Sequence, residues 1–325
     1  MEKLYKIAID TKGSDKGQEM MVKGALMALD AHKTLGVCLV GDSAVIEAVI
    51  SERPDLKDRI EIVDAPDEIN NYDSPATALF EKPNSSLVRA LTLVREREDL
   101  TGLINAGSTG ALIAGSMRFL SGKDRVRPAL AAVLPAERGG FTCLVDTGAT
   151  IDCAAPTLLH FARLGTDFMR RLYRIENPRV GLLSNGAEPT KGNKVVKEAH
   201  VLLAEDETIN FVGNIEGTGA LSGACDVLVC DGFAGNQVLK VTEGAARRII
   251  TDIVKYSKAT DNPELMKLVG HLMAKYDFNS LGGGIILGVE KPVIKAHGAA
   301  NEQSIVSTAG MLLNMAENKE IFDGK

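Results

Sequence analysis

The sequence lacks tryptophan, and aromatic residues make up only 4% of the chain. That composition, together with 32 glycines, suits an α/β protein with many tight strand-to-helix turns better than a β-sandwich. No run of 18 apolar residues occurs, so no membrane-spanning helix is predicted. The first ten residues lack the apolar segment of a signal peptide, and we expect a cytoplasmic protein. The net charge of −6 disfavours a nucleic-acid partner.

Cysteine is also scarce. The chain has five, an odd number without Cys-x-x-Cys spacing, which is typical of reduced thiols in a cytosolic protein rather than of a disulfide framework. Four of them lie in or beside apolar runs, so we expect those to be buried. The five are Cys38, Cys143, Cys153, Cys225 and Cys230.

Several familiar catalytic signatures are missing. The chain has no GxxxxGK[ST] phosphate loop, no GxSxG elbow and no HExxH zinc motif. Residues 217–223 have GxGxxxG spacing, and no clear acidic residue follows a strand about twenty residues later, unlike a dinucleotide-binding turn. We therefore predict that the protein uses no cofactor and no metal ion.

Short apolar runs alternate with helical patterns along the whole chain. Predicted strands cover residues 6–10, 36–40, 59–63, 102–105, 129–134, 141–146, 179–183, 209–212, 227–230, 285–287 and 293–295. Predicted helices cover residues 18–31, 44–51, 85–96, 108–120, 155–172, 194–204, 237–254, 263–275 and 302–315.

This alternation predicts a doubly wound α/β fold, with a mainly parallel sheet and helices on both faces. The successive runs at 129–134 and 141–146 predict one antiparallel hairpin within that sheet. No Gly-, Ser- or Pro-rich linker marks a boundary, so we expect residues 1–325 to form a single α/β unit.

The segment 226–240 is the most informative. An apolar run at 227–230 ends in Asp231-Gly232, and we expect a loop closed by Gly235-Asn236 before a helix that begins at Gln237. Ligands of open α/β sheets bind where strands end beside helix N-termini, and anions are favoured there. An ordinary strand-to-helix turn would show the same pattern.

The loop Gly186–Asn193 lies between a predicted strand and a predicted helix. Lys191 at the helix entrance could neutralise phosphate and the oxyanion of an acyl-transfer intermediate. Asn193 is the expected N-cap of the following helix. A solvated loop lysine is the plain alternative.

The turn Asn105–Ala111 also joins a strand to a helix. Gly107, Ser108, Thr109 and Gly110 could form an anion cradle from backbone N–H groups, hydroxyls and the helix dipole. A glycine-rich turn in which Ser108 merely caps the helix is the alternative.

The segment Asp146–Cys153 holds two carboxylates six residues apart, with no histidine or third acid nearby in sequence, so a metal pair is poorly supported. Asp152 is better interpreted as a helix cap. Cys153 has no adjacent base, which favours a structural thiol over a nucleophile.

Seven segments in order resemble the bacterial phosphate acyltransferase family (PlsX), from about residue 5 to residue 315. They are Asn105–Ala111, Arg127–Leu130, Asp146–Cys153, Lys191–Asn193, Gly213–Gly217, Asp226–Lys240 and Lys295–Gly298. The resemblance implies a Rossmann-like three-layer fold similar to isocitrate and isopropylmalate dehydrogenases. It implies transfer of an acyl chain from acyl carrier protein to inorganic phosphate, giving acyl phosphate for phospholipid synthesis.

The resemblance also implies roles for particular residues. The family's Lys-Gly-Asn lysine lies in the active site, which assigns Lys191 to catalysis, with Asn236 as a donor and Asp231 as an orienting group. The expected phosphate- and substrate-binding residues are Gly107, Ser108, Thr109, Gly110, Asn193, Asp10, Gly13, Lys82, Ser85 and His297. For His297 a structural role fits equally well.

Departures from the family pattern leave the acyl donor open. The family's opening Asp-Ala-Met-Gly-Gly-Asp-His-Ala-Pro is here Asp10–Gln18, in which Asp10, Gly13 and Asp15 are retained. Two alternatives follow: a phosphotransacetylase-like enzyme that uses acyl-CoA, and a non-catalytic scaffold associated with membranes.

The resemblance implies a protruding helical segment at about 256–276. Leu265, Leu268, Val269, Leu272 and Met273 form an apolar stripe there, as in a helix that lies on a membrane surface. The resemblance implies a homodimer and weak peripheral contact with the inner face of the cell membrane. A helix packed on its own core, or on a second subunit, would show the same stripe.

Overall fold

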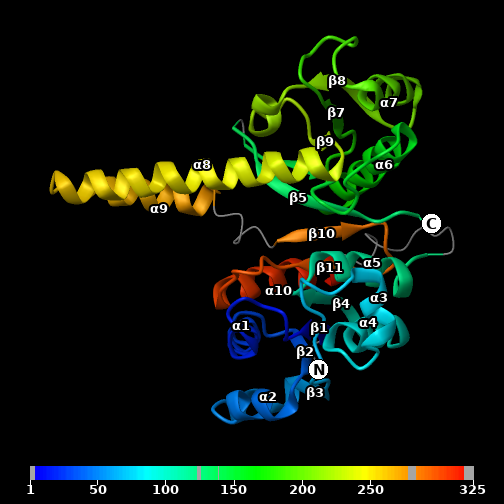
Figure 1. Cartoon of the computed structure of the whole chain (residues 1–325). Coiled ribbons are helices and arrows are strands. Elements are labelled where there is room, and N and C mark those ends of the chain that lie inside the picture. The colour runs from blue at the N-terminus through cyan, green and yellow to red at the C-terminus, as the bar shows by residue number, and fades with distance from the viewer. Residues whose placement is uncertain (1–3, 123–125, 138, 277–282, 318–325) are drawn as a thin grey trace. The chain divides into compact units, whose positions relative to one another are not determined.

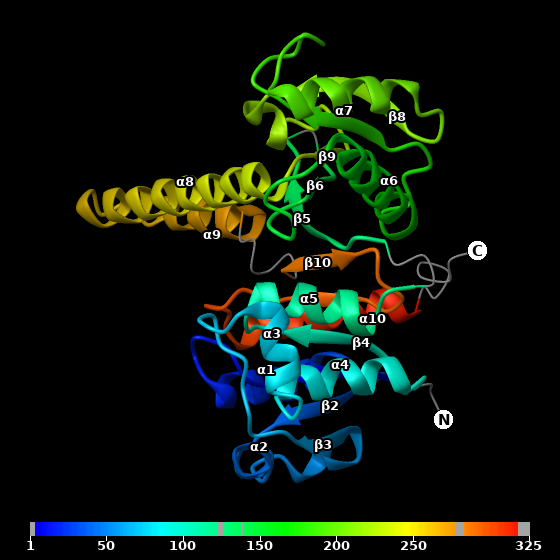
Figure 2. The ribbon, with the colours of Figure 1, turned by 45° about the vertical axis from the view of Figure 1, so that its right-hand side comes forward.

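The computed structural model describes residues 4–122, 126–137, 139–276 and 283–317. The chain divides into two compact units, residues 1–130 with 282–325 and residues 131–281. Each unit combines parallel strands with helices (Figures 1 and 2). The expectation that residues 1–325 form a single unit stays a prediction.

The strands of the first unit follow the order β3-β2-β1-β4-β11-β10. Neighbours run parallel, except that β10 is antiparallel to β11. All seven residues of β2 are buried, as expected for a parallel strand covered on both faces. The bounds are β1 Tyr5–Asp10, β2 Leu35–Gly41, β3 Ile60–Asp64, β4 Leu100–Asn105, β10 Gly284–Leu287 and β11 Val293–Lys295.

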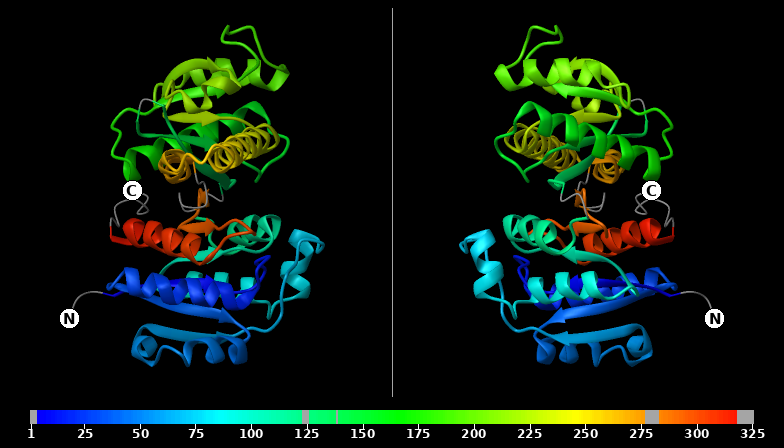
Figure 3. Two further views of the ribbon diagram at one scale, coloured as in Figure 1. Left: turned by 90° about the vertical axis from the view of Figure 1, so that its left-hand side faces the viewer. Right: turned by 90° about the vertical axis from the view of Figure 1, so that its right-hand side faces the viewer.

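Helices cover both faces of these strands (Figure 3). On one side α1 packs on α10 and α2, and on the other α4 and α5 pack on the strands, with α3 against α5. Asp42 caps α2 by accepting from the N–H groups of Ala44 and Val45. The bounds are α1 Gln18–Ala31, α2 Ser43–Ile50, α3 Pro75–Glu81, α4 Ser86–Glu96, α5 Thr109–Phe119, α10 Glu302–Glu317 and the short 3-10 helix η1 Pro54–Arg59.

The strands of the second unit follow the order β5-β6-β9-β7-β8. The β5–β6 pair is antiparallel, which confirms the predicted hairpin, and the other pairs are parallel. A core cluster that includes Leu144, Cys225 and Leu228 packs beneath them. The bounds are β5 Ala129–Pro135, β6 Phe141–Val145, β7 Arg179–Leu183, β8 Asn210–Ile215 and β9 Val227–Val229.

Two helices of this unit pack on its sheet and two form a hairpin. Helix α6 lies on β6, β7 and β9, and α7 lies on β7 and β8. Helices α8 and α9 pack against each other and project from the strands, as Figure 1 shows in yellow and orange. The bounds are α6 Ala155–Leu172, α7 Lys194–Glu205, α8 Gly232–Ala259, α9 Glu264–Tyr276 and the 3-10 helix η2 Gly217–Leu221.

The predicted fold class, α/β with a mainly parallel sheet, is confirmed. The predicted start of α8 is wrong, because this helix begins at Gly232 rather than Gln237. Residues 232–236 are therefore its first turns and not a loop. Sequence analysis also missed α3, since its seven residues are too few to show a helical period.

Candidate functional site

The carboxyl ends of three parallel strands bring polar side chains together in the first unit. Asp10 at the end of β1 is in register with Asn105 at the end of β4, and Asn105 is in register with Lys295 at the end of β11. The Asn105 amide donates to Asp10 Oδ2 at 2.8 Å. Lys295 Nζ donates to the carbonyl oxygen of Ala106 at 3.0 Å. Sequence analysis had not assigned roles to Asn105 and Lys295, although both directly end predicted strands.

Asp10 is a buried carboxyl group, only 2% exposed. Burial raises the pKa of Asp10 to about 6, against hydrogen bonds from Ser86, the Lys12 N–H and Asn105, which favour the charged form. The nearby Glu68 charge raises the pKa further. Asp10 therefore titrates close to neutral pH.

The predicted anion cradle lies beside Asp10. Asp10, Gly13, Asn105, Gly107 and Ser108 line one narrow crevice, together with Glu68 and Ser86. Gly13 has a φ of 80°, and a Cβ there would lie 2.6 Å from the Gly107 Cα, so this approach requires glycine. Ser108 caps α5 by accepting from the Ala111 N–H at 3.5 Å, the plainer role foreseen for it.

Other predicted residues of this unit do not line the crevice. Lys82 Nζ lies 2.6 Å from Asp73 Oδ2 and 3.1 Å from the carbonyl oxygen of Glu68. His297 is exposed, and its Nδ1 accepts from the Ala299 N–H at 3.1 Å. Thr109 is half-buried and Gly110 is exposed in the first turn of α5.

In the second unit, Asp146 follows β6 and organises a turn. Its side chain is fully buried and accepts from the N–H groups of Gly148, Ala149 and Thr150, at 3.3, 3.1 and 2.6 Å. A buried carboxylate that accepts from three backbone N–H groups fixes the conformation of the turn. Among the described residues, no group of three His, Cys, Asp or Glu side chains could hold one.

The first turn of α8 lies directly on this Asp146 turn. The Gly232 N–H donates to the Thr150 carbonyl oxygen at 2.7 Å. A Cβ on Gly235 would lie 1.9 Å from the Asp146 carbonyl oxygen. Gly232 and Gly235 thus leave room for the neighbouring backbone.

Asp231 is the N-cap of α8. Its Oδ1 accepts from the Ala234 N–H at 2.7 Å. Asn236 lies half-buried in the second turn of the helix. Asp231 follows β9 as the sequence predicted, whereas Asn236, expected in a loop, lies within α8.

Lys191 is exposed on the loop between β7 and α7. The loop is fixed by its own hydrogen bonds: the Lys191 N–H donates to the Glu188 carbonyl oxygen at 3.0 Å, and the Gly192 N–H donates to Asn185 Oδ1 at 2.8 Å. Asn193 caps α7 by accepting from the Val196 N–H at 2.9 Å, as expected. The Lys191 side chain therefore extends from an ordered loop.

Six buried side-chain atoms of the described residues have no hydrogen-bond partner; those of Ser116 and Thr166 lie within helices, and the other four lie near these strand ends. Asn105 Oδ1 and Ser85 Oγ are such atoms in the first unit, and Thr150 Oγ1 and Ser184 Oγ are such atoms in the second. Leaving a buried polar atom unpaired costs roughly 1–3 kcal/mol. A polar ligand at either edge could offset that cost.

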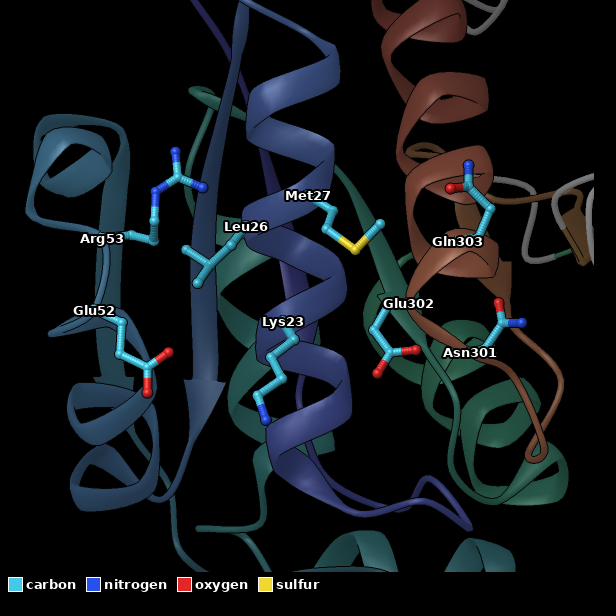
Figure 4. Close-up of a pocket in the computed structure, with 8 residues that line it drawn as sticks. All are labelled: Lys23, Leu26, Met27, Glu52, Arg53, Asn301, Glu302 and Gln303. Carbon is cyan, nitrogen blue, oxygen red and sulfur yellow. The ribbon is translucent and has the colours of Figure 1, made fainter.

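A larger pocket, of about 480 Å3, lies elsewhere in the first unit (Figure 4). Lys23, Leu26 and Met27 of α1 line it, with residues 52–53 and 301–303. It contains none of the predicted site residues. Across the part of the chain that the structure describes, no helix is long and apolar enough to cross a bilayer.

The fold is an α/β architecture of the kind found in phosphotransacetylases. A solved phosphotransacetylase from Streptococcus pyogenes matches it with a TM-score of 0.63 at 15% identity, covering 98% of this chain and 94% of that one. At that identity the likeness concerns the fold alone.

Sequence comparisons identify the family. The family described as "Fatty acid synthesis protein" matches residues 5–320. A phosphate acyltransferase from Halothermothrix orenii is 40% identical over 311 residues, 92% of this chain and 91% of that protein. A phosphate acyltransferase from Caldanaerobacter subterraneus subsp. tengcongensis is 37% identical over 320 residues, 96% and 94% of the two chains. The chain belongs to the phosphate acyltransferase family, and it is an acyltransferase.

Gly235→Ala is expected to lower the free energy of unfolding by about 1–3 kcal/mol or more, because the new methyl group would overlap the Asp146 backbone. Gly244→Ala in the same helix is the matched control, since no atom lies within 4 Å of a Cβ there. That control should raise stability by up to about 1 kcal/mol. Urea unfolding of both variants checks this, and equal stabilities would contradict the close approach.

Asp10→Asn should remove a pH dependence of stability. The folded-state pKa of Asp10 is raised to about 6, so between about 4 and 6 the folded protein binds the proton better than the unfolded chain. This contribution is present at low pH and is lost as pH rises through 6. Urea unfolding at pH 4.5 and 7.5 should show wild type losing stability relative to the variant as pH rises. A difference that is the same at both pH values would refute the buried titration.

Proposed function

We propose that this protein transfers an acyl group from acyl carrier protein to inorganic phosphate and so makes acyl phosphate for phospholipid synthesis. The observation that carries the proposal is the match to named phosphate acyltransferases over more than nine-tenths of the chain. The ordered loop that presents Lys191 supports it.

In the proposed reaction, a phosphate oxygen attacks the thioester carbonyl carbon. A C–O bond forms, the carbonyl oxygen carries negative charge in the tetrahedral intermediate, and the C–S bond then breaks to release the carrier thiol. Lys191 would bind phosphate and stabilise that oxyanion. Asn236 would supply a further donor, while Asp231 keeps the start of α8 in place. No covalent acyl-enzyme is required, since bound and oriented phosphate is the nucleophile.

The Gly107–Gly110 turn of the first unit is the second proposed anion-binding element. The N-terminus of helix α5 in this turn supports an anionic ligand. Asp10, Gly13, Lys82, Ser85 and His297 would shape this region. Asn193 would act through its cap of α7.

The identity of the acyl donor distinguishes this proposal from the alternative of a phosphotransacetylase-like enzyme that uses acyl-CoA. Incubation of the protein with phosphate and either acyl carrier thioester or acyl-CoA, followed by hydroxylamine trapping, measures acyl phosphate from each donor. The proposal requires the carrier thioester to react faster. A preference for acyl-CoA would favour the phosphotransacetylase-like alternative, and no product from either donor would favour a scaffold.

We also propose a cytoplasmic homodimer with weak attachment to the inner face of the membrane. The α8–α9 hairpin carries two exposed apolar faces. On α8, Val241, Ile249 and Tyr256 are 67%, 58% and 63% exposed. On α9, Leu268 and Met273 are 44% and 52% exposed.

These two faces support different contacts. Val269 is buried and Leu272 is half-buried, so part of the predicted α9 stripe belongs to the hairpin itself. We assign the α8 face to a second copy of the chain. We assign Leu268 and Met273, which flank the buried Val269 on opposite sides of α9, to contact with lipid. Each fully buried apolar side chain contributes about 1.5–3 kcal/mol, so the α9 contact is weak and reversible.

Lys191→Ala should lower turnover roughly a hundred- to a thousandfold, the usual cost of losing one oxyanion donor. Folding stability should change little, because the side chain is exposed. Lys194→Ala is the control, since Lys194 is an exposed lysine in the first turn of α7. Rates of acyl phosphate formation at saturating phosphate check the assignment, which fails if Lys191→Ala remains near the wild-type rate.

Two double variants separate the faces of the hairpin. Val241→Glu with Ile249→Glu should reduce the mass in light scattering from twice 34.6 kDa to one chain. Leu268→Glu with Met273→Glu should keep the dimer mass and abolish co-sedimentation with anionic liposomes. A wild-type monomer at micromolar concentration, or unchanged liposome binding by the second variant, would contradict the respective assignment.

A further inference from the structure

The Gly213–Gly217 segment has no role in the function proposed so far. It ends strand β8, which pairs with β7, the strand that leads into the Lys191 loop. The register of this pair shifts between Val180 and Gly181, and Gly213 has a φ of 96°. Such an irregularity re-aims the side chains that follow it. The next side chain is that of Asn214, which is 5% exposed.

Both polar atoms of Asn214 have partners. Its Nδ2 donates to the Glu188 carbonyl oxygen at 2.8 Å, and its Oδ1 lies 3.0 Å from His200 Nδ1. The carbonyl at Glu188 accepts only, so the amide nitrogen must face it and the amide oxygen must face His200. His200 Nδ1 is therefore the protonated nitrogen and donates.

The Glu188 carbonyl oxygen connects this pair to Lys191. It accepts from the Lys191 N–H at 3.0 Å as well as from Asn214. Gly186 lies close to the Lys191 side chain, since a Cβ on Gly186 would be 2.7 Å from Lys191 Cγ. The Lys191 backbone is thus held in place, which lowers the conformational entropy of the loop that is lost when the ammonium group binds its ligand.

We propose that Asn214, oriented by His200, is a positioning residue that holds the Lys191 loop in its catalytic conformation. This inference rests on the proposed function of Lys191. Asn214 touches no reacting atom in this assignment and acts only through the Glu188 carbonyl. A displacement of about 1 Å at a catalytic group can cost roughly a hundredfold in rate.

Asn214→Asp tests this by replacing the amide donor with an oxygen of the same size. It should lower kcat for acyl phosphate formation about ten- to a hundredfold. Amide hydrogen exchange at Lys191 and Gly192 should become at least about tenfold faster, a result that a change of overall stability alone would not confine to this loop. Asn210→Asp on the same strand is the matched control, because its amide reaches only the Asn177 carbonyl oxygen at 3.5 Å.

His200 provides a second route to the same test. His200→Phe keeps the ring contact with Phe211, whose centroid lies 5.1 Å away, and removes the Nδ1 donor. It should reproduce part of the loss even if Asn214→Asp folds poorly. His200→Asn, whose Nδ2–H can stand in for the Nδ1 donor, should restore part of the rate.

A double-mutant cycle completes the test. In a Lys191→Ala background, Asn214→Asp should cause no further loss, since both changes act through one group. A further independent loss, or unchanged exchange at Lys191 and Gly192, overturns the assignment. If unaltered protein forms no acyl phosphate, the proposed function fails, whereas hydrogen exchange still decides whether Asn214 holds the loop.

Discussion

Parallel pairing of strands is the constraint on which the rest of this molecule depends. Parallel neighbours point their carboxyl ends the same way, so side chains distant in sequence meet at one edge of each unit. Asp10, Asn105 and Lys295 span nearly the whole chain and stand in register on three strands. In the second unit the same rule places the Asp146 turn, the start of α8 and the Lys191 loop after parallel strands.

The turns at these edges are held by backbone contacts rather than by large side chains. Glycines permit the approach of Gly13 to Gly107 and of α8 to the Asp146 turn. Hydrogen bonds from buried side chains, such as Asn214 to the Glu188 carbonyl, then fix the geometry. Rigid turns of this kind fix the direction of the side chains that follow the strands.

Much of this could be predicted from the sequence, because its signals are local. The alternating apolar runs predicted most of the strands. The predicted helices Gln18–Ala31 and Ala155–Leu172 match the observed ones at both ends. Asn193 was foreseen as a cap from its position alone. The predicted start of α8 was wrong. Gly232 and Gly235 favour a turn locally, whereas in the structure they lie in a helix that contacts the Asp146 turn.

The residues that were missed depend on contacts across the fold. Nothing near Asn214 in sequence shows that its amide reaches Glu188, 26 residues away. Nor does the sequence divide the 263–275 stripe into a face that packs on α8 and a face that is exposed. Predicting the Asn214 contact requires the register of β8 against β7. Predicting which residues of α9 are buried requires knowing how α9 packs on α8.

The cysteines lead to a practical consequence. Cys38, Cys143, Cys225 and Cys230 are buried, and Cys153 is the half-exposed one of the five. Burial raises the pKa of Cys38, Cys143 and Cys225 to about 12 and that of Cys230 well above its usual range, so these four have almost no thiolate. A maleimide dye should therefore label the native chain once, at Cys153. Its sulfur lies 3.6 Å from the Thr150 carbonyl oxygen, so a single fluorophore would stand beside the Asp146 turn.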